Sequence, residues 1–127
     1  MISMSHLDHL VLMVKNMDAT VAFYTEVLGM QNVSKDGHVS LHFGMQKFNL
    51  HEKASEFSPK AKRPSIGSAD ICFIANDPLY DIIAHLNHCG ISIEEGPVQR
   101  TGATGPIYSI YIRDPDENLI EIANKME

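Results

Sequence analysis

The feature that most constrains the fold is an internal repeat, because one order of structural patterns occurs twice along the chain. Residues 2–57 and residues 66–125 each predict a strand, a helix and then three further strands. In each half the predicted helix ends at a glycine, Gly29 or Gly90, as suits the left-handed residue that follows a last helical turn. Sequence identity between the halves is low, so the repeat is one of architecture.

Local signals in the first half support this order. Residues 7–14 form a nearly continuous apolar run, which is typical of a buried strand. Asn16 or Asp18 can cap the helix that follows. Asp36-Gly37 predicts a tight hairpin turn, and residues 38–43 alternate between apolar and polar side chains, as a strand with one buried face does.

The second half repeats the pattern after a polar, proline-containing linker at residues 52–65. Asp77 and Pro78 predict a helix start by side-chain capping and a pre-set backbone. Residues 91–95 predict a strand, and residues 96–106 a glycine-containing hairpin loop. The last two predicted strands, residues 107–112 and 118–123, are joined by a turn.

Bulk properties favour one small globular domain spanning residues 1–127, with module one at about 5–58 and module two at about 66–125. The net charge is -6, and no long run of Lys or Arg offers the positive potential that nucleic acids require. We see no signal peptide and no membrane span. The two cysteines do not form a disulfide framework of the secreted kind, so the cytoplasm is the expected location.

Each half carries two polar residues that can bind a metal ion. His9 lies on the first strand of the first half and His51 ends its last strand, while Asp70 and Glu121 occupy the corresponding strands of the second half. Two imidazoles and two carboxylates suit Zn, Ni, Fe, Mn or Co. We therefore predict a divalent metal site formed by these four side chains.

The spacing within the halves supports the equivalence of the last two ligands. Gly44 precedes His51 by seven residues, and Asp114 precedes Glu121 by seven. Asp70 stands on an otherwise apolar stripe, where a carboxylate is costly unless it is paired or binds a metal.

Simpler interpretations exist for each residue alone. His9 fits a partly exposed histidine, Glu121 the solvent side of a half-exposed strand, and Asp70 a turn cap or an arginine partner. A second group, at His85, His88 and Cys89, shares a helix surface, but it also fits an exposed last turn in which imidazolium favours the helix dipole.

Three residues are candidates for substrate binding. Arg100 lies on the predicted glycine-flanked loop, where its guanidinium can bind a carboxylate or a phosphate. A solvated loop tip is the alternative. His42 and Tyr111 lie on the polar faces of predicted strands and either line a cavity or face water.

With these residues assembled, the chain resembles the vicinal oxygen chelate superfamily, which includes glyoxalases, bleomycin-resistance proteins and extradiol dioxygenases. The resemblance covers nearly the whole chain, and its landmarks are residues 7–12, 23–24, 27–30 and 113–121. Within the superfamily the chain is similar to glyoxalase domain-containing protein 5 and bacterial virulence-associated relatives. The segments that carry this narrower similarity are residues 43–44, 46–47, 49–52, 59–61, 67–70, 95–97 and 100–103.

The resemblance implies an α+β fold of two tandem βαβββ modules that form a curved mixed sheet cup. It also implies a homodimer with shared sites, a small-molecule substrate, and metal ligands at His9, His51, Asp70 and Glu121. Asp70 departs from the superfamily, whose enzymes usually have histidine there, so three-ligand binding, another metal or no metal stays open. The arginines with which glyoxalase I holds glutathione are not found.

The leading functional prediction is a metal-dependent enzyme of lyase or isomerase type whose substrate chelates the metal through adjacent oxygens. Glu121 or His51 is expected to move the proton. The alternative is a dimer that sequesters a ligand without catalysis, as bleomycin-resistance proteins do. A regulatory domain with a filled cavity is a third possibility.

Overall fold

Two successive halves of the chain each fold into a sheet with its own helix. The computed structural model describes residues 1–53 and 57–126, so part of the predicted linker lies outside the described residues. The two units are Met1–Gly67 and Ser68–Glu127. The elements of the first unit are β1 (His9–Met13), α1 (Met17–Ala22), the π-helical turn η1 (Phe23–Val27), β2 (Gln31–Lys35), β3 (His38–Phe43) and β4 (Gln46–His51). Those of the second are β5 (Asp70–Ile74), α2 (Leu79–His88), β6 (Glu95–Gly102), β7 (Gly105–Arg113) and β8 (Leu119–Lys125).

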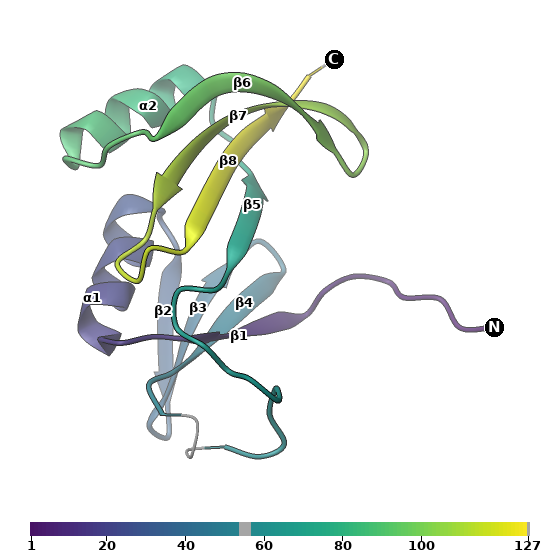
Figure 1. Cartoon of the computed structure of the whole chain (residues 1–127), viewed down its shortest axis with the longest axis vertical. Coiled ribbons are helices and arrows are strands. Elements are labelled where there is room, and N and C mark those ends of the chain that lie inside the picture. Colours follow the sequence, from purple (N-terminus) through teal and green to yellow (C-terminus); the bar gives the residue numbers. More distant parts are fainter. Residues whose placement is uncertain (54–56, 127) are drawn as a thin grey trace. The chain divides into compact units, whose positions relative to one another are not determined.

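The two sheets have the same topology, which confirms the repeat. The first has the strand order β1-β4-β3-β2, and the second has the order β5-β8-β7-β6 (Figure 1). In each sheet the first and last strands of the unit pair in parallel, and the other neighbours are antiparallel. Each sheet is therefore mixed, as the α+β prediction requires.

Local signals in the first unit act as predicted. The Asn16 side chain caps α1 by accepting a hydrogen bond from the backbone N–H of Ala19 at 3.0 Å. The turn between β2 and β3 has positive φ at both Asp36 and Gly37, 53° and 78°, which is the conformation of a two-residue hairpin.

Each sheet buries one face. In the first unit Leu41, Phe48 and Leu50 are almost fully buried, and the ring of Tyr24 from η1 meets that of Phe48 edge to face at 5.7 Å. In the second unit Leu86 of α2 is fully buried, and the buried isoleucines that share one face of the sheet are Ile110, Ile112, Ile120 and Ile122. Burying a side chain of this size stabilises a fold by about 1.5–3 kcal/mol, so the opposite faces are left to carry polar groups.

The start of α2 differs from the prediction. No side chain caps the helix from Asp77; instead Asn124 on β8 accepts from the backbone N–H of Leu79 at 2.7 Å and donates to the carbonyl of Asp77 at 2.9 Å. The cap therefore comes from a residue 45 positions away in sequence, and it fastens the helix to the sheet that it covers.

A second difference concerns β6. The strand predicted at residues 91–95 begins only at Glu95, and it then runs to Gly102 through most of the segment predicted as a loop. Arg100 is consequently a strand residue that pairs with Ile107, and it does not lie at a loop tip. Pairing with β7, continuous from Val98 to Gly102 after a register shift that follows Glu95, satisfies backbone groups that a loop would have exposed to water.

Among the helices of the described residues, none combines the length and the apolar character needed to cross a bilayer.

Candidate functional site

The exposed face of the second sheet brings together two of the four predicted metal ligands. In the β5–β8 pair, Cys72 lies opposite Glu121, and Asp70 lies two residues before Cys72 on the same face. Asp70 is exposed and Glu121 is half-buried. The expectation of a buried carboxylate at Asp70 is therefore wrong, because the stripe it occupies faces outward. The two carboxylates are diagonal neighbours across the parallel β5–β8 pair.

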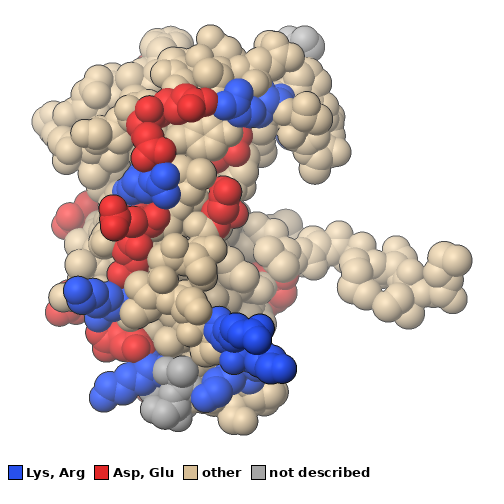
Figure 2. Space-filling model, viewed as in Figure 1, with Lys and Arg blue, Asp and Glu red and all other residues tan. Residues whose placement is uncertain are grey.

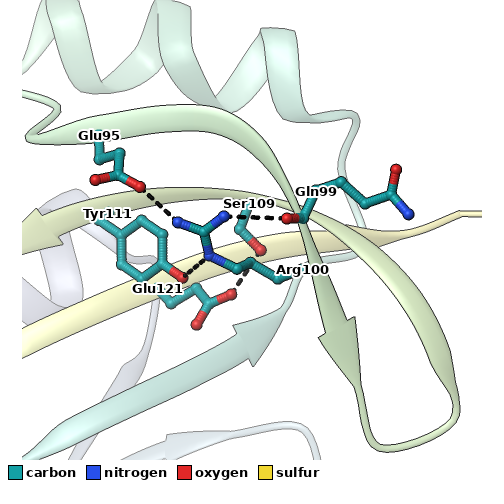
Figure 3. A network of polar contacts seen from close by, with 6 residues as sticks. All are labelled: Glu95, Gln99, Arg100, Ser109, Tyr111 and Glu121. Carbon is teal, nitrogen blue, oxygen red and sulfur yellow. Dashed lines mark hydrogen bonds and ion pairs between the residues drawn. The ribbon is translucent and has the colours of Figure 1, made fainter.

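A hydrogen bond fixes the orientation of Glu121. The hydroxyl of Ser109 on β7, a fully buried residue, donates to Oε2 of Glu121 at 2.6 Å (Figure 3). Ligand carboxylates in metal sites are commonly oriented in this way by a second residue that does not touch the metal. The Cys72 thiol is a second hydrogen-bond partner of the Glu121 carboxylate.

The thiol of Cys72 responds to this surrounding. Its pKa rises to about 11; partial burial of the thiol is the largest cause, and the negative charges of Glu121 and Asp70 act in the same direction. The Cys72 thiol therefore stays neutral near pH 7, and the negative charge of this part of the sheet face comes from Asp70 and Glu121.

We expect the Cys72 thiol to alkylate slowly. A pKa near 11 leaves little thiolate at about pH 8, so Cys72 in a metal-free Cys89→Ser variant should react with iodoacetamide about tenfold or more slowly than a cysteine in an unstructured peptide. The rate should rise until the pH passes 11, and Glu121→Gln in the same background should increase it. Equal rates for protein and peptide from pH 7 to 9 would contradict the assignment.

A second network lies on the same face of this sheet, where Tyr111 on β7 pairs directly with Glu121 on β8. The Arg100 guanidinium donates through Nε to the Tyr111 hydroxyl at 3.0 Å and lies over the Tyr111 ring, 5.5 Å from its centre (Figure 3). It also pairs with the carboxylate of Glu95. Two predicted substrate-binding residues, Arg100 and Tyr111, are thus brought into contact. The arginine already has a carboxylate partner, which an anionic substrate would have to displace.

Acidic and basic side chains lie side by side over the visible surface of the second unit (Figure 2). Besides the Arg100 pair, Arg113 forms a two-point ion pair with Glu94, at 2.9 and 3.0 Å. The hydrogen bond from Arg113 lowers the pKa of the Glu94 carboxyl. Both arginines of the sheet are therefore engaged by glutamates.

In the first unit His9 has the environment of a metal ligand. Its Nδ1 lies 2.9 Å from the carboxylate of Asp8, and the hydrogen bond lowers the pKa of Asp8. A carboxylate at Nδ1 holds the ring in the tautomer whose Nε2 can bind a metal. The side chain is 46% exposed, so Nε2 is accessible.

His51 does not occupy the point that corresponds to Glu121. Cys72, two residues after Asp70, pairs with Glu121, whereas Val11, two residues after His9, pairs with Asn49. His51 pairs with Met13, four positions along from the partner of His9. At about 3.3 Å per residue that offset is about 13 Å. The seven-residue spacing from Gly44 and Asp114 was therefore a wrong guide to equivalence, because the turns before β4 and β8 differ in length.

Asn49 is the residue that the sequence interpretation missed. It is half-buried, and its Oδ1 accepts a hydrogen bond from the Ser40 hydroxyl at 3.2 Å. An amide is a weaker metal ligand than a carboxylate, so nothing in the sequence marks Asn49 as a ligand. Strand register, had it been known, would have identified it.

His51 and His42 belong to a cavity of about 450 Å³ on the exposed face of the first sheet. The His51 ring also stacks on Phe57, with ring centres 4.0 Å apart. His9 does not line this cavity. The two predicted histidine ligands therefore lie apart, His9 at the start of β1 and His51 in the cavity over β2–β4.

Within the described part of the chain, no group of three or more His, Cys, Asp or Glu side chains is arranged to hold a metal ion. This applies to the rival group as well, where Cys89 and His85 contact each other at 3.6 Å on α2. The donors that fit a divalent metal are the Asp70–Glu121 pair in one unit and His9 with its Asp8 partner in the other.

Comparison with known proteins places this arrangement in a family. The chain matches the profile of the Glyoxalase/Bleomycin resistance protein/Dioxygenase superfamily over residues 6–122. It is 57% identical to virulence protein STM3117 of Salmonella typhimurium over 92% of this chain and 82% of that one. The crystal structure of that protein covers 98% of this chain and is itself covered in full, with a TM-score of 0.95.

Two further relatives extend the comparison. Glyoxalase domain-containing protein RDO1 of Mycosarcoma maydis is 52% identical over 97% of this chain and 70% of its own length. A lactoylglutathione lyase from Agrobacterium tumefaciens shares 27% identity and a TM-score of 0.75, over 96% of this chain and 95% of that one.

Proposed function

Because the chain belongs to the Glyoxalase/Bleomycin resistance protein/Dioxygenase superfamily, we propose that it is a divalent-metal-dependent enzyme of lyase or isomerase type. Its substrate would be a small molecule that chelates the metal through adjacent oxygens. The observation that carries the proposal is the pair of carboxylates, Asp70 and Glu121, on one exposed sheet face, with Glu121 oriented by Ser109. The similarity to a lactoylglutathione lyase supports the same chemistry.

The proposed ligands are Asp70, Glu121 and His9, and the fourth predicted ligand, His51, lies in the cavity of the first unit. A bound divalent ion supplies Lewis-acid polarisation of the substrate oxygens. Asp8 holds the His9 ring, and Ser109 holds one oxygen of Glu121. The Glu121 carboxylate is the proposed acceptor of the substrate proton, with His51 as the second candidate.

The proposal includes a homodimer with shared sites and a place in the cytoplasm. Neither Arg100 nor Tyr111 need touch the metal for this chemistry. Their contact with each other makes them candidates for orienting the substrate from β6 and β7.

We expect the wild-type protein to bind one divalent ion per site. The test is elemental analysis of protein purified without chelator, followed by removal of metal and separate reconstitution with Zn, Ni, Fe, Mn and Co. Metal binding releases protons and stabilises the folded state, so the thermal midpoint should rise with the preferred ion. Less than roughly 0.2 ion per chain after every reconstitution would reject the proposal.

One observation favours a second function, metal-independent sequestration of a ligand. The first unit has the amide of Asn49 where the second has the carboxylate of Glu121, and it has a sizeable cavity instead. A sequestering protein would bind its ligand equally well after chelator treatment and after Glu121→Gln. A metal enzyme would lose binding, turnover or both under either treatment.

A further inference from the structure

We infer that the cavity over β2–β4 is a binding site for an anionic group, a carboxylate or a phosphate, of a small-molecule ligand. The inference deepens the proposed function by naming the charge of its substrate, but the cavity lies wholly within the first unit. Its volume of about 450 Å³ lies within the range of small-molecule pockets. Anion binding can therefore be tested on protein without metal.

The strand register explains how one face comes to be basic. His42 on β3 pairs with Lys47 on β4, and His38 pairs with Lys35 on β2. Because alternate residues of a strand share a face, these four side chains stand on the side of the sheet opposite its buried core. All four line the cavity.

The polar groups of the cavity are mostly hydrogen-bond donors. The ammonium groups of Lys35 and Lys47 can only donate, and each imidazole of His38, His42 and His51 has at least one N–H. Asp36, in the turn, is the single carboxylate among the lining residues. A ligand seated there therefore meets groups that favour negative charge.

Asn49 adds a donor to the same face. Since its Oδ1 accepts from the Ser40 hydroxyl, at 3.2 Å, its amide nitrogen is the end directed to other partners. Ser40 is buried and Asn49 half-buried, so this orientation is set by the sheet. Asn49 stands where the second unit has Glu121, and as a neutral amide it adds no negative charge to the cavity.

The charge of the cavity contrasts with that of the chain. The protein carries a net charge of -6, yet the cavity is lined by two lysines and one aspartate, with three histidines besides. Lys47 is half-buried, and its charge is among the causes that lower the pKa of the exposed Asp8 carboxyl, which itself does not line the cavity. A partly buried cation of this kind gains most from an anionic partner.

Imidazoles also bind metals, but a lysine ammonium group has no lone pair with which to bind one. An anion is therefore the occupant that the lysines, the histidines and the Asn49 amide have in common. Phosphate and carboxylate share this chemistry, and the experiment separates them.

The test is a titration of metal-free, isotope-labelled protein at constant pH, monitored by NMR through the histidine ring signals. The probes are inorganic phosphate, succinate and, as a neutral control, glycerol. We expect saturable shifts of the His38 and His42 rings with phosphate or succinate and none with glycerol. A preference for one of the two anions identifies the group that the natural ligand carries.

The matched variants are Lys35→Gln/Lys47→Gln, which removes the cavity's cations, and Lys53→Gln/Lys62→Gln, which changes net charge equally at exposed positions outside it. We expect the first to weaken anion binding about tenfold or more and the second to leave it unchanged. Equal weakening by both variants, the absence of saturable shifts, or equal shifts with glycerol would overturn the inference. Because no metal is present, these results are independent of whether reconstitution succeeds.

Discussion

Glu121→Gln should lower the affinity for a divalent metal by about 100-fold or more. The substitution keeps the shape of the side chain but replaces a carboxylate by an amide, which is a poor ligand for the proposed ions. It reproduces in the second unit the amide that Asn49 already provides at the equivalent point of the first. The measurement is competition for the metal with a chromophoric chelator, in parallel with wild-type protein.

Two control variants sharpen this result. Glu94→Gln removes a carboxylate of the same unit that is paired with Arg113, so it should leave the metal affinity unchanged. Ser109→Ala removes only the hydrogen bond that orients Glu121, and it should weaken binding by about 10-fold, less than Glu121→Gln. Unchanged metal affinity in Glu121→Gln would remove this residue from the site.

Asp114→Ala should lower the free energy of unfolding by about 3 kcal/mol or more. The Asp114 carboxylate is buried and accepts three hydrogen bonds, from the backbone N–H of Asp116 and Asn118 at 2.9 Å each and from Nδ2 of Asn118 at 2.8 Å. Removing it leaves those donors without an acceptor in a place that water reaches poorly. Urea denaturation measures the loss. The slope of the unfolding free energy against urea concentration is compared with that of the wild type.

Asp81→Ala is the matched control, because Asp81 is an exposed aspartate in the first turn of α2. It should cost less than about 1 kcal/mol, the usual size of a charge–dipole contribution. The Asp114 loop also supports the candidate metal site. Asn118 accepts through Oδ1 from the backbone N–H of Ala69. The loop of residues 114–118 therefore joins the start of β8, which carries Glu121, to the start of β5, which carries Asp70. An Asp114→Ala protein as stable as the control would contradict this role.

Much of the fold was predictable from the chain itself. Alternation at residues 38–43, the turn at Asp36-Gly37 and the Asn16 cap are short-range signals, and each is confirmed. The extent of β6 and the Asn124 cap of α2 were missed. Both depend on pairing with β7 or β8, and partners so distant in sequence leave no local mark.

The candidate site, like the fold, was predictable from the sequence only in part. The residue types were visible in the sequence, and the register places Asp70 and Glu121 as diagonal neighbours on one face, while their joint role as ligands stays a prediction. The equivalence of His51 and Glu121 was not correct, because it was counted from turns and not from paired strands. The register that identifies Asn49 is fixed by which faces the two strands bury together, and a residue count along one strand does not contain it.

Since Leu41, Phe48 and Leu50 close one hydrophobic core and the isoleucines of β7 and β8 close another, the outward faces of the two sheets are free to diverge. A substitution that alters charge on one of them leaves the packing beneath the other undisturbed. One outward face can therefore carry carboxylates and the other lysines and histidines while both sheets keep the same strand order.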